Sequence, residues 1–221
     1  MFLVNATQLL QLLTLSSTAL PIGTYCYSQG VESAIVNGII QDEATAMAYF
    51  DEVLELLLLR FELPILKRLM DSDTDKDAFL YWANWYRASR ESRELLAESQ
   101  QLAVSLNAWI KAVLNDDMYV AKQLGFVPVY AALCRKLALQ EADVLTAYSF
   151  TVLENQVLAA VKTVPLGQMS GQRILWHLQQ QIPTVVERAM KLQDHEMSSN
   201  LPQYAMFSMQ HETQYSRLFR S

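Results

Sequence analysis

Apolar residues recur along this chain with the spacing of an α-helix, and this periodicity constrains the fold more than any other feature. Met47, Phe50, Leu54, Leu57 and Phe61 fall at i, i+3, i+7, i+10 and i+14, on one face of a helix. Only six Gly and six Pro interrupt the 221 residues, and no run alternates like a half-buried strand. We predict an all-α, single-domain bundle of about eight to ten helices over residues 1–221.

The same periodicity places individual helices. Asp42 precedes the first stripe and is expected to be the N-cap of its helix. Further helices are predicted over about 89–113, 171–181 and 183–192, and Val129, Leu133 and Leu137 mark another after Pro128. A helix over 141–162 should stop near Pro165, because proline interrupts a helix interior. A second stripe is aromatic, and we interpret it as core; it comprises Phe79, Trp82, Trp85 and Tyr86.

The charge of the chain is low and acidic. A net charge of −6 and a pI of about 5.1 argue against nucleic-acid binding, which needs a basic footprint. Arg87, Arg90 and Arg93 alternate with Glu91 and Glu94, which predicts a solvated helix face. Charged residues make up 18%, below the ~25% of ordinary soluble domains. We therefore expect apolar surface that an oligomer or a partner covers.

The residue types that carry chemistry are scattered. The candidate metal ligands and nucleophiles are His177, His195, His211, Cys26 and Cys134, and none has the close spacing of a metal site. There is no phosphate-binding loop of the form G-x-x-x-x-G-K-[ST] and no G-x-S-x-G elbow. We predict a protein that binds rather than catalyses, without a cofactor or metal of its own.

The sequence indicates a reducing, cytoplasmic environment. Its start, MFLVNATQLLQLL, lacks the basic residues of a signal peptide. The longest apolar cluster, Val53–Leu59, is far shorter than the ~20 residues of a membrane span. We expect no membrane contact.

Glu154, Asn155 and Gln156 stand together in an otherwise apolar helix. Three consecutive residues sweep roughly 200° around a helix, so at least one should face the interior. An unpaired buried amide or carboxylate costs about 1–3 kcal/mol. This helix therefore carries either a buried polar network or a docking surface.

The chain then breaks at Pro165-Leu166-Gly167 and continues as an amide-rich segment to Arg173. Gly167 and Gly171 could serve a helix connection, or they could let a partner's backbone come close. Arg173 could dock a partner, or it could satisfy Glu154 or a helix end inside the fold. These alternatives are open from the residues alone.

Two further segments allow a local and a functional interpretation. The turn at Pro21-Ile22-Gly23 leads to TYCYSQ, which is either a helix entry capped by Ser28 or an interface rich in Tyr. The tail, residues 211–221, is either a frayed end or a segment that becomes ordered on a partner, because Tyr, Phe and Arg are common interface anchors.

Four stretches together resemble the urease accessory protein family UreF. They are PIGTYCYSQGVE at 21–32, ASRESRELLAESQQLAVSL at 88–106, ENQVLAAVKTVPLGQMSGQR at 154–173 and HETQYSRLFRS at 211–221. The first looks like the family signature PxGxxSYSQGxE. The chain departs from the family pattern at Thr24, Cys26, Leu102-Ala103 and Met169, which affects local geometry more than membership.

The resemblance implies a function in assembly. UreF proteins are all-helical, dimeric, non-catalytic factors that bind UreD (also called UreH) and recruit the GTPase UreG. Together they deliver nickel to the urease apoprotein. An alternative is that the chain activates or regulates GTP hydrolysis by UreG through an arginine finger, for which Arg173 and Arg220 are the candidates.

The candidate site residues fall into three groups. The predicted UreG side comprises Lys162, Pro165, Gly167, Gln168, Gly171, Gln172 and Arg173. The predicted UreD or UreH side comprises Tyr215, Ser216, Arg217, Leu218, Phe219, Arg220 and Ser221. The signature turn comprises Pro21, Gly23, Tyr27, Ser28, Gln29, Gly30 and Glu32.

Overall fold

In the described part of the chain all regular secondary structure is helical, and there is no strand. The computed structural model describes residues 5–199 apart from Asp73, Glu91 and Pro165, together with Phe219. The α-helices are α1 (Ala6–Ser16), α2 (Val31–Val36), α3 (Glu43–Glu52), α4 (Leu63–Asp71), α5 (Lys76–Ala88), α6 (Arg93–Leu114), α7 (Phe126–Lys136), α8 (Glu141–Thr163) and α9 (Gln168–Lys191). The prediction of an all-α bundle of eight to ten helices is confirmed.

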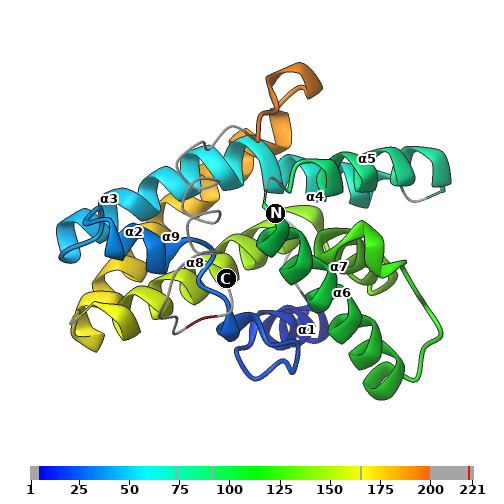
Figure 1. Ribbon diagram of the computed structural model, residues 1–221. Helices are drawn as coiled ribbons and strands as arrows, with labels where there is room; N and C mark the ends of the chain where they lie inside the picture. The colour runs from blue at the N-terminus through cyan, green and yellow to red at the C-terminus, as the bar shows by residue number, and fades with distance from the viewer. Residues whose placement is uncertain (1–4, 73, 91, 165, 200–218, 220–221) are drawn as a thin grey trace.

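Short helical segments connect these helices. Three are 3-10 turns, η1 (Thr24–Cys26), η3 (Lys122–Leu124) and η4 (Asp194–Glu196). The fourth, η2 (Val53–Glu62), is a π-helix that joins α3 to α4 without a break (Figure 1). Among the described residues, a contiguous cluster of buried apolar side chains draws members from each α-helix, α1 to α9.

The long helix α3–η2–α4 begins and continues for local reasons. Asp42 caps α3, because its side chain accepts a hydrogen bond from the Thr45 amide at 2.9 Å, as predicted. Pro64 has no N–H for the carbonyl of Arg60 four residues earlier. That carbonyl instead accepts a bond from the Ser198 amide at 3.0 Å. The segment after α9 is thereby tied to the middle of the long helix.

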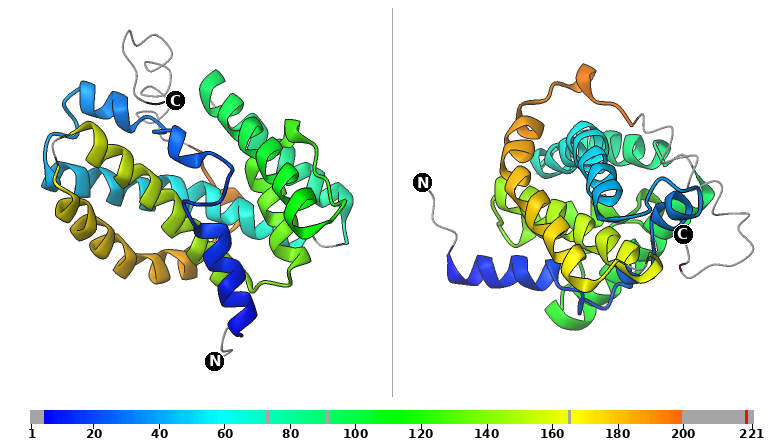
Figure 2. Two further views of the ribbon diagram at one scale, coloured as in Figure 1. Left: turned by 90° about the horizontal axis from the view of Figure 1, so that it is seen from below. Right: turned by 90° about the vertical axis from the view of Figure 1, so that its left-hand side faces the viewer.

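Helix α8 forms the centre of the bundle. It packs against α9, α1 and α2, and also contacts α3 and α4 (Figures 1 and 2). By length and composition it is the one described helix that could cross a membrane, but 50% of the relevant stretch is buried inside the protein. Its apolar sequence is therefore explained by its place in the core.

Two sequence predictions about helix ends are wrong. Residues 168–191 form one helix, α9, rather than two, and Pro183 lies inside it. Pro183 is exposed, so water can solvate the carbonyl left without a donor, while Ile182, Val185 and Val186 continue the buried face. Ser28 does not cap α2, whose N-cap is Gly30 without a side-chain bond.

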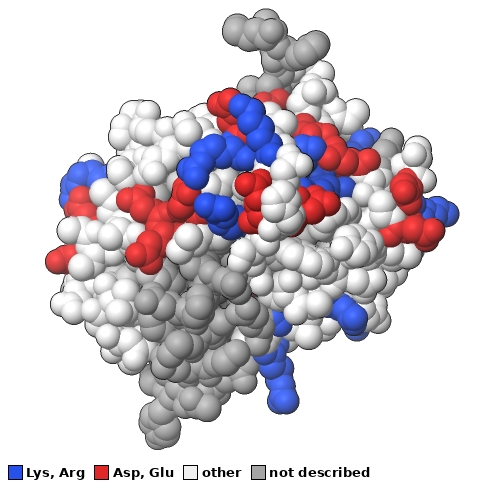
Figure 3. Space-filling model, turned by 90° about the horizontal axis from the view of Figure 1, so that it is seen from above, with Lys and Arg blue, Asp and Glu red and all other residues white. Residues whose placement is uncertain are grey.

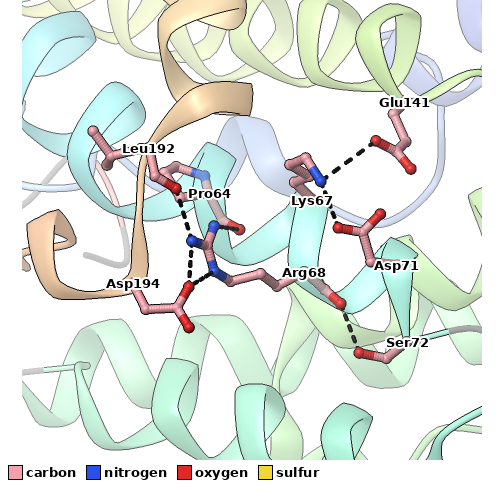
Figure 4. A network of polar contacts seen from close by, with 8 residues as sticks. All are labelled: Pro64, Lys67, Arg68, Asp71, Ser72, Glu141, Leu192 and Asp194. Carbon is pink, nitrogen blue, oxygen red and sulfur yellow. Dashed lines mark hydrogen bonds and ion pairs between the residues drawn. The ribbon is translucent and has the colours of Figure 1, made fainter.

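A polar cluster fixes the chain where it leaves α9 (Figure 4). The Arg68 guanidinium donates to Asp194 Oδ1 at 2.6 Å through Nε and to the Leu192 carbonyl at 2.8 Å through a terminal nitrogen. It also lies 5.2 Å from the centre of the Trp82 ring. Beside it, Lys67 pairs with Asp71 at 2.5 Å.

Acidic and basic side chains are intermixed on the face seen in Figure 3, with large uncharged areas between them. On that face no sign of charge dominates.

Candidate partner-binding site

Gln156 of α8 belongs to a buried polar network that includes the signature turn. Gln156 is 1% exposed, and its Nε2 donates to Gln29 Oε1 at 2.9 Å. Gln29 in turn donates through Nε2 to Glu98 Oε1 of α6 at 2.7 Å. One interpretation of the Glu154–Gln156 run, a buried polar network, is therefore confirmed for Gln156.

A second polar cluster lies at the end of the π-helix. Arg90 donates to Glu62 Oε1 at 3.0 Å, and Tyr148 donates its hydroxyl to Glu62 Oε2 at 2.9 Å. The side chains of Arg90 and Glu62 are only 9% and 7% exposed. Burial raises the pKa of Tyr148 well above its usual value, and the Glu62 carboxylate raises that pKa further, so the phenol remains a donor.

Both clusters line one partly enclosed cavity of about 60 Å³. Its wall combines Gln29 and Glu98 of the first cluster with Glu62, Arg90 and Tyr148 of the second. Asn155 of α8 and apolar residues of α1, α6 and α7 complete it. Asn155 contributes a buried Oδ1 that has no hydrogen-bond partner within the described part of the chain. The cavity is thus lined by polar groups from four different regions of the sequence.

The signature turn faces mostly inward. Tyr27, Ser28 and Glu32 are buried, whereas Pro21 is exposed. Gly23 and Gly30 have φ of 85° and 86°, a conformation that glycine adopts without strain. Gln29 also has a positive φ, 52°. In this conformation its side chain bonds to both Glu98 and Gln156. The turn motif is therefore explained by internal structure.

The predicted UreG segment is largely exposed. Lys162, Gly167, Gln168, Gln172 and Arg173 are all exposed at the end of α8 and the first two turns of α9. Pro165 lies outside the described residues. Two apolar side chains extend the same surface, Met169 at 69% exposed and Trp176 at 68% exposed.

Gly171 has a role inside the fold. It is buried, and a Cβ at this position would lie 2.6 Å from Val161 Cγ2 of α8. Gly167, in contrast, has nothing within 4 Å of such a Cβ. The prediction that a partner's backbone approaches both glycines is therefore corrected for Gly171, since its open side is filled by α8.

Arg173 binds a residue that the sequence did not suggest. It makes a two-bond fork with Glu43 of α3, at 2.7 Å from Nε and 2.5 Å from a terminal nitrogen, and it also donates to Ser170 Oγ at 2.9 Å. These bonds lower the pKa of the Glu43 carboxyl to about 2. The pair is at the surface, so the alternative that Arg173 satisfies Glu154 or a helix end inside the fold does not hold.

Two more contacts continue this row between the long helix and α9. His177 Nε2 lies 3.0 Å from Asp51 Oδ1, and Arg188 bonds to both carboxylate oxygens of Glu55, at 2.8 Å and 2.6 Å. Among the described residues, the His177 ring therefore contacts a single carboxylate, that of Asp51, and no second histidine or cysteine. His195 lies in η4, and His211 lies outside the described residues.

The described residues offer no metal or thiolate centre. Within them, no group of three or more His, Cys, Asp or Glu side chains could hold a metal ion. Cys134 is buried, and burial raises the pKa of its thiol to about 12. Cys26 is half-buried in η1.

Most of the predicted tail site lies outside the described residues: Tyr215, Ser216, Arg217, Leu218, Arg220 and Ser221. Phe219 is described, and it packs half-buried against the core. Its amide donates to Glu32 Oε2 at 3.2 Å, and its ring centre lies 6.0 Å from Lys162 Nζ. Residues from all three predicted groups therefore meet at one place.

Sequence reasoning missed three charged members of the polar clusters: Glu62, Arg90 and Glu98. The prediction that Arg90 belongs to a solvated face is wrong, because its guanidinium stacks on the Tyr86 ring at 4.5 Å and pairs with Glu62. Glu62 carried a signal, since it lies between Phe61 and the apolar run Leu63–Leu66. A charge in such a run points to a buried partner.

Comparison with known proteins gives a consistent result. The UreF family profile matches residues 40–179. The urease accessory protein UreF of Nitrosospira multiformis is 43% identical and covers 96% of this chain and 97% of its own length. The UreF protein of Methylobacillus flagellatus is 40% identical, covering 98% and 99%. The bifunctional urease accessory protein UreEF of Bordetella bronchiseptica is 41% identical over 99% of this chain and 53% of its own length.

The described residues form an all-α fold, and both the matching profile and the similar proteins are those of urease accessory proteins. The chain belongs to the UreF family.

Proposed function

We propose that this chain is a urease maturation factor of the cytoplasm. It acts as a non-catalytic scaffold that binds UreD or UreH and recruits the GTPase UreG, so that nickel is inserted into the urease apoprotein. The similar proteins are named urease accessory proteins, which supports a role in urease maturation. The exposed surfaces support a scaffold that acts by binding partners.

One observation carries the assignment of the UreG side. Gln168, Met169, Gln172 and Trp176 are exposed on the same side of α9, which we call the α9 face. Two large apolar side chains flank amides that can donate and accept hydrogen bonds. Aromatic and Met side chains are enriched in interfaces, whereas a surface without a partner seldom leaves both so exposed.

The surface pair of Arg173 bears on the alternative function, activation of GTP hydrolysis. A fork to Glu43 holds the guanidinium on the protein's own surface. An arginine finger would have to leave that carboxylate to reach a phosphate. We therefore propose a scaffold, with Arg173 shaping the edge of the α9 face.

Arg173→Ala tests this assignment. The variant should weaken UreG binding while the melting temperature barely changes, because an exposed ion pair contributes little stability. Basal GTP hydrolysis by UreG, measured with and without the wild-type protein, should be the same. A large stimulation that Arg173→Ala abolishes would establish the activator instead.

The UreD or UreH side is proposed to use the tail. Deleting residues 215–221 should leave helix content intact and abolish co-purification with UreD or UreH, because a terminal segment contributes little core while Tyr, Phe and Arg anchor interfaces. Unchanged binding by the truncated protein would refute this side of the scaffold.

We further propose that the scaffold is a homodimer. The low charged fraction and the exposed Leu9, Leu10 and Leu13 of α1 support self-association. Light scattering at micromolar concentration should give the dimer mass, and a strict monomer would argue against it.

A further inference from the structure

Phe219 is held at a site built from two distant parts of the chain. Its backbone amide contacts Glu32 at the start of α2, and its ring faces Lys162 in the last turn of α8. We propose that Glu32 and Lys162 form a docking site for Phe219 of the same chain, which holds this tail residue in cis while no partner is bound.

Glu32 is well suited to bind a backbone amide. It is only 3% exposed, yet its Oε2 accepts the Phe219 N–H at 3.2 Å. A buried carboxylate requires hydrogen-bond donors, and a backbone N–H bonded to a charged acceptor is stronger than one bonded to a neutral acceptor. A donor brought by a residue 187 positions away in sequence is therefore a specific contact rather than a local turn.

Lys162 and the core supply the complementary contacts for the side chain. The ammonium lies 6.0 Å from the ring centre, within the range of a cation–π interaction. The ring is half-buried against the hydrophobic core, which removes apolar surface from water. A site that offers a carboxylate to the backbone and an ammonium to the ring fits an aromatic residue, and Phe219 is the aromatic residue that occupies it.

The geometry of α2 and α8 prepares this site without the tail. The two helices pack directly against each other, so Glu32 and Lys162 are held on rigid elements (Figure 1). Gly30, with φ of 86°, turns the chain sharply into α2 just before Glu32.

A consequence follows that rests on the proposed function. The tail is proposed to bind UreD or UreH, and Lys162 is proposed to lie at the edge of the UreG side. In the structure, Phe219 of the tail and Lys162 contact each other. Docking in cis and engagement of these residues by partners therefore compete.

The test uses the full chain alone, so its outcome does not depend on partner binding. The protein is labelled with ¹⁵N-phenylalanine, and the Phe219 amide signal is assigned by its loss in Phe219→Leu. Hydrogen exchange of that amide should be at least about tenfold slower than in a free peptide of residues 211–221, because docking protects it. Exchange as fast as in the peptide would overturn the proposal.

Two variants identify the receptor residues. Lys162→Met keeps the apolar stem and removes the charge, and Glu32→Gln keeps the shape of the acceptor and removes its charge. Each should speed exchange of the Phe219 amide several-fold, whereas Lys191→Met, at the exposed end of α9, should not. Because Lys162 is exposed, the Lys162→Met variant should fold. If the Phe219 amide exchanges as slowly in both single variants as in the wild type, the site is refuted. Failure of the recruitment assays with slow exchange intact would refute only the partner assignments.

Discussion

Glu62 and Glu55 lie on the same π-helical segment, but their carboxylates are in opposite environments. Glu62 is buried and binds Arg90 and Tyr148, whereas Glu55 pairs with Arg188 at the surface. Charges removed from water must be paired, while exposed pairs are weakened by solvent and salt. The contribution of each carboxylate should therefore differ greatly.

We expect Glu62→Ala to lower the free energy of unfolding by about 3–5 kcal/mol, because it leaves the Arg90 charge buried without its partner. Glu55→Ala is the matched control and should cost less than about 1 kcal/mol. Urea denaturation followed by circular dichroism measures both. Equal losses in the two variants would show that the Glu62 cluster is not a buried unit.

Gly171 and Gly167 provide a second matched pair. Gly171→Val should destabilise the protein by about 1–3 kcal/mol, because the new side chain would meet the stiff Val161 at the α8–α9 contact. Gly167→Val should change stability by less than about 1 kcal/mol, since Gly167 is in open space with an extended backbone. Thermal melts of both proteins test this difference. A stable Gly171→Val would mean that the two helices are not in close contact here.

Among the helices, the start of a helix could be predicted where an apolar stripe follows directly after a capping residue. Asp42 and the stripe from Met47 to Phe61 correctly gave a helix start. The π-helical geometry of η2 could not be predicted, because apolar residues are so dense over Val53–Leu59 that they fit a helix of either pitch. The break expected at Pro183 was wrong, because packing of Val185 and Val186 outweighs one lost hydrogen bond at an exposed position.

The Arg68 side chain holds the first part of the segment after α9, and this gives a prediction. Arg68→Lys should loosen residues 193–196, because an ammonium cannot bond to Asp194 and the Leu192 carbonyl as the planar guanidinium does. Hydrogen exchange in this segment should become faster while the core helices keep their protection. Arg188→Lys, at an exposed fork, is the control and should leave the segment unchanged. Equal exchange in the Arg68 variant and the wild type would contradict this role.

For the whole molecule, the candidate site was only partly predictable. The residue types of Glu154–Gln156 showed that a polar group must be buried, but its partners Gln29 and Glu98 are distant in sequence. The partner of Arg173 was missed for the same reason, since Glu43 is 130 positions away. Periodicity reports which side of a helix is buried, and it does not report which helices meet.

The α9 face joins these scales into one proposed function. Its exposed side chains are held in place by the Gly171 contact to α8 and by the row of ion pairs to α3 and η2. A rigid surface of this kind suits recruitment of a partner better than chemistry.

The most direct measurement is the mass of the complex formed with UreD or UreH and UreG by a variant carrying Gln168→Ala, Gln172→Ala and Trp176→Ala. We predict that the wild-type protein elutes with both partners and that the variant keeps UreD or UreH and loses UreG. Tyr81→Ala, which alters an exposed aromatic residue on α5, should behave as the wild type. A variant that is folded and still recruits UreG fully would contradict the account.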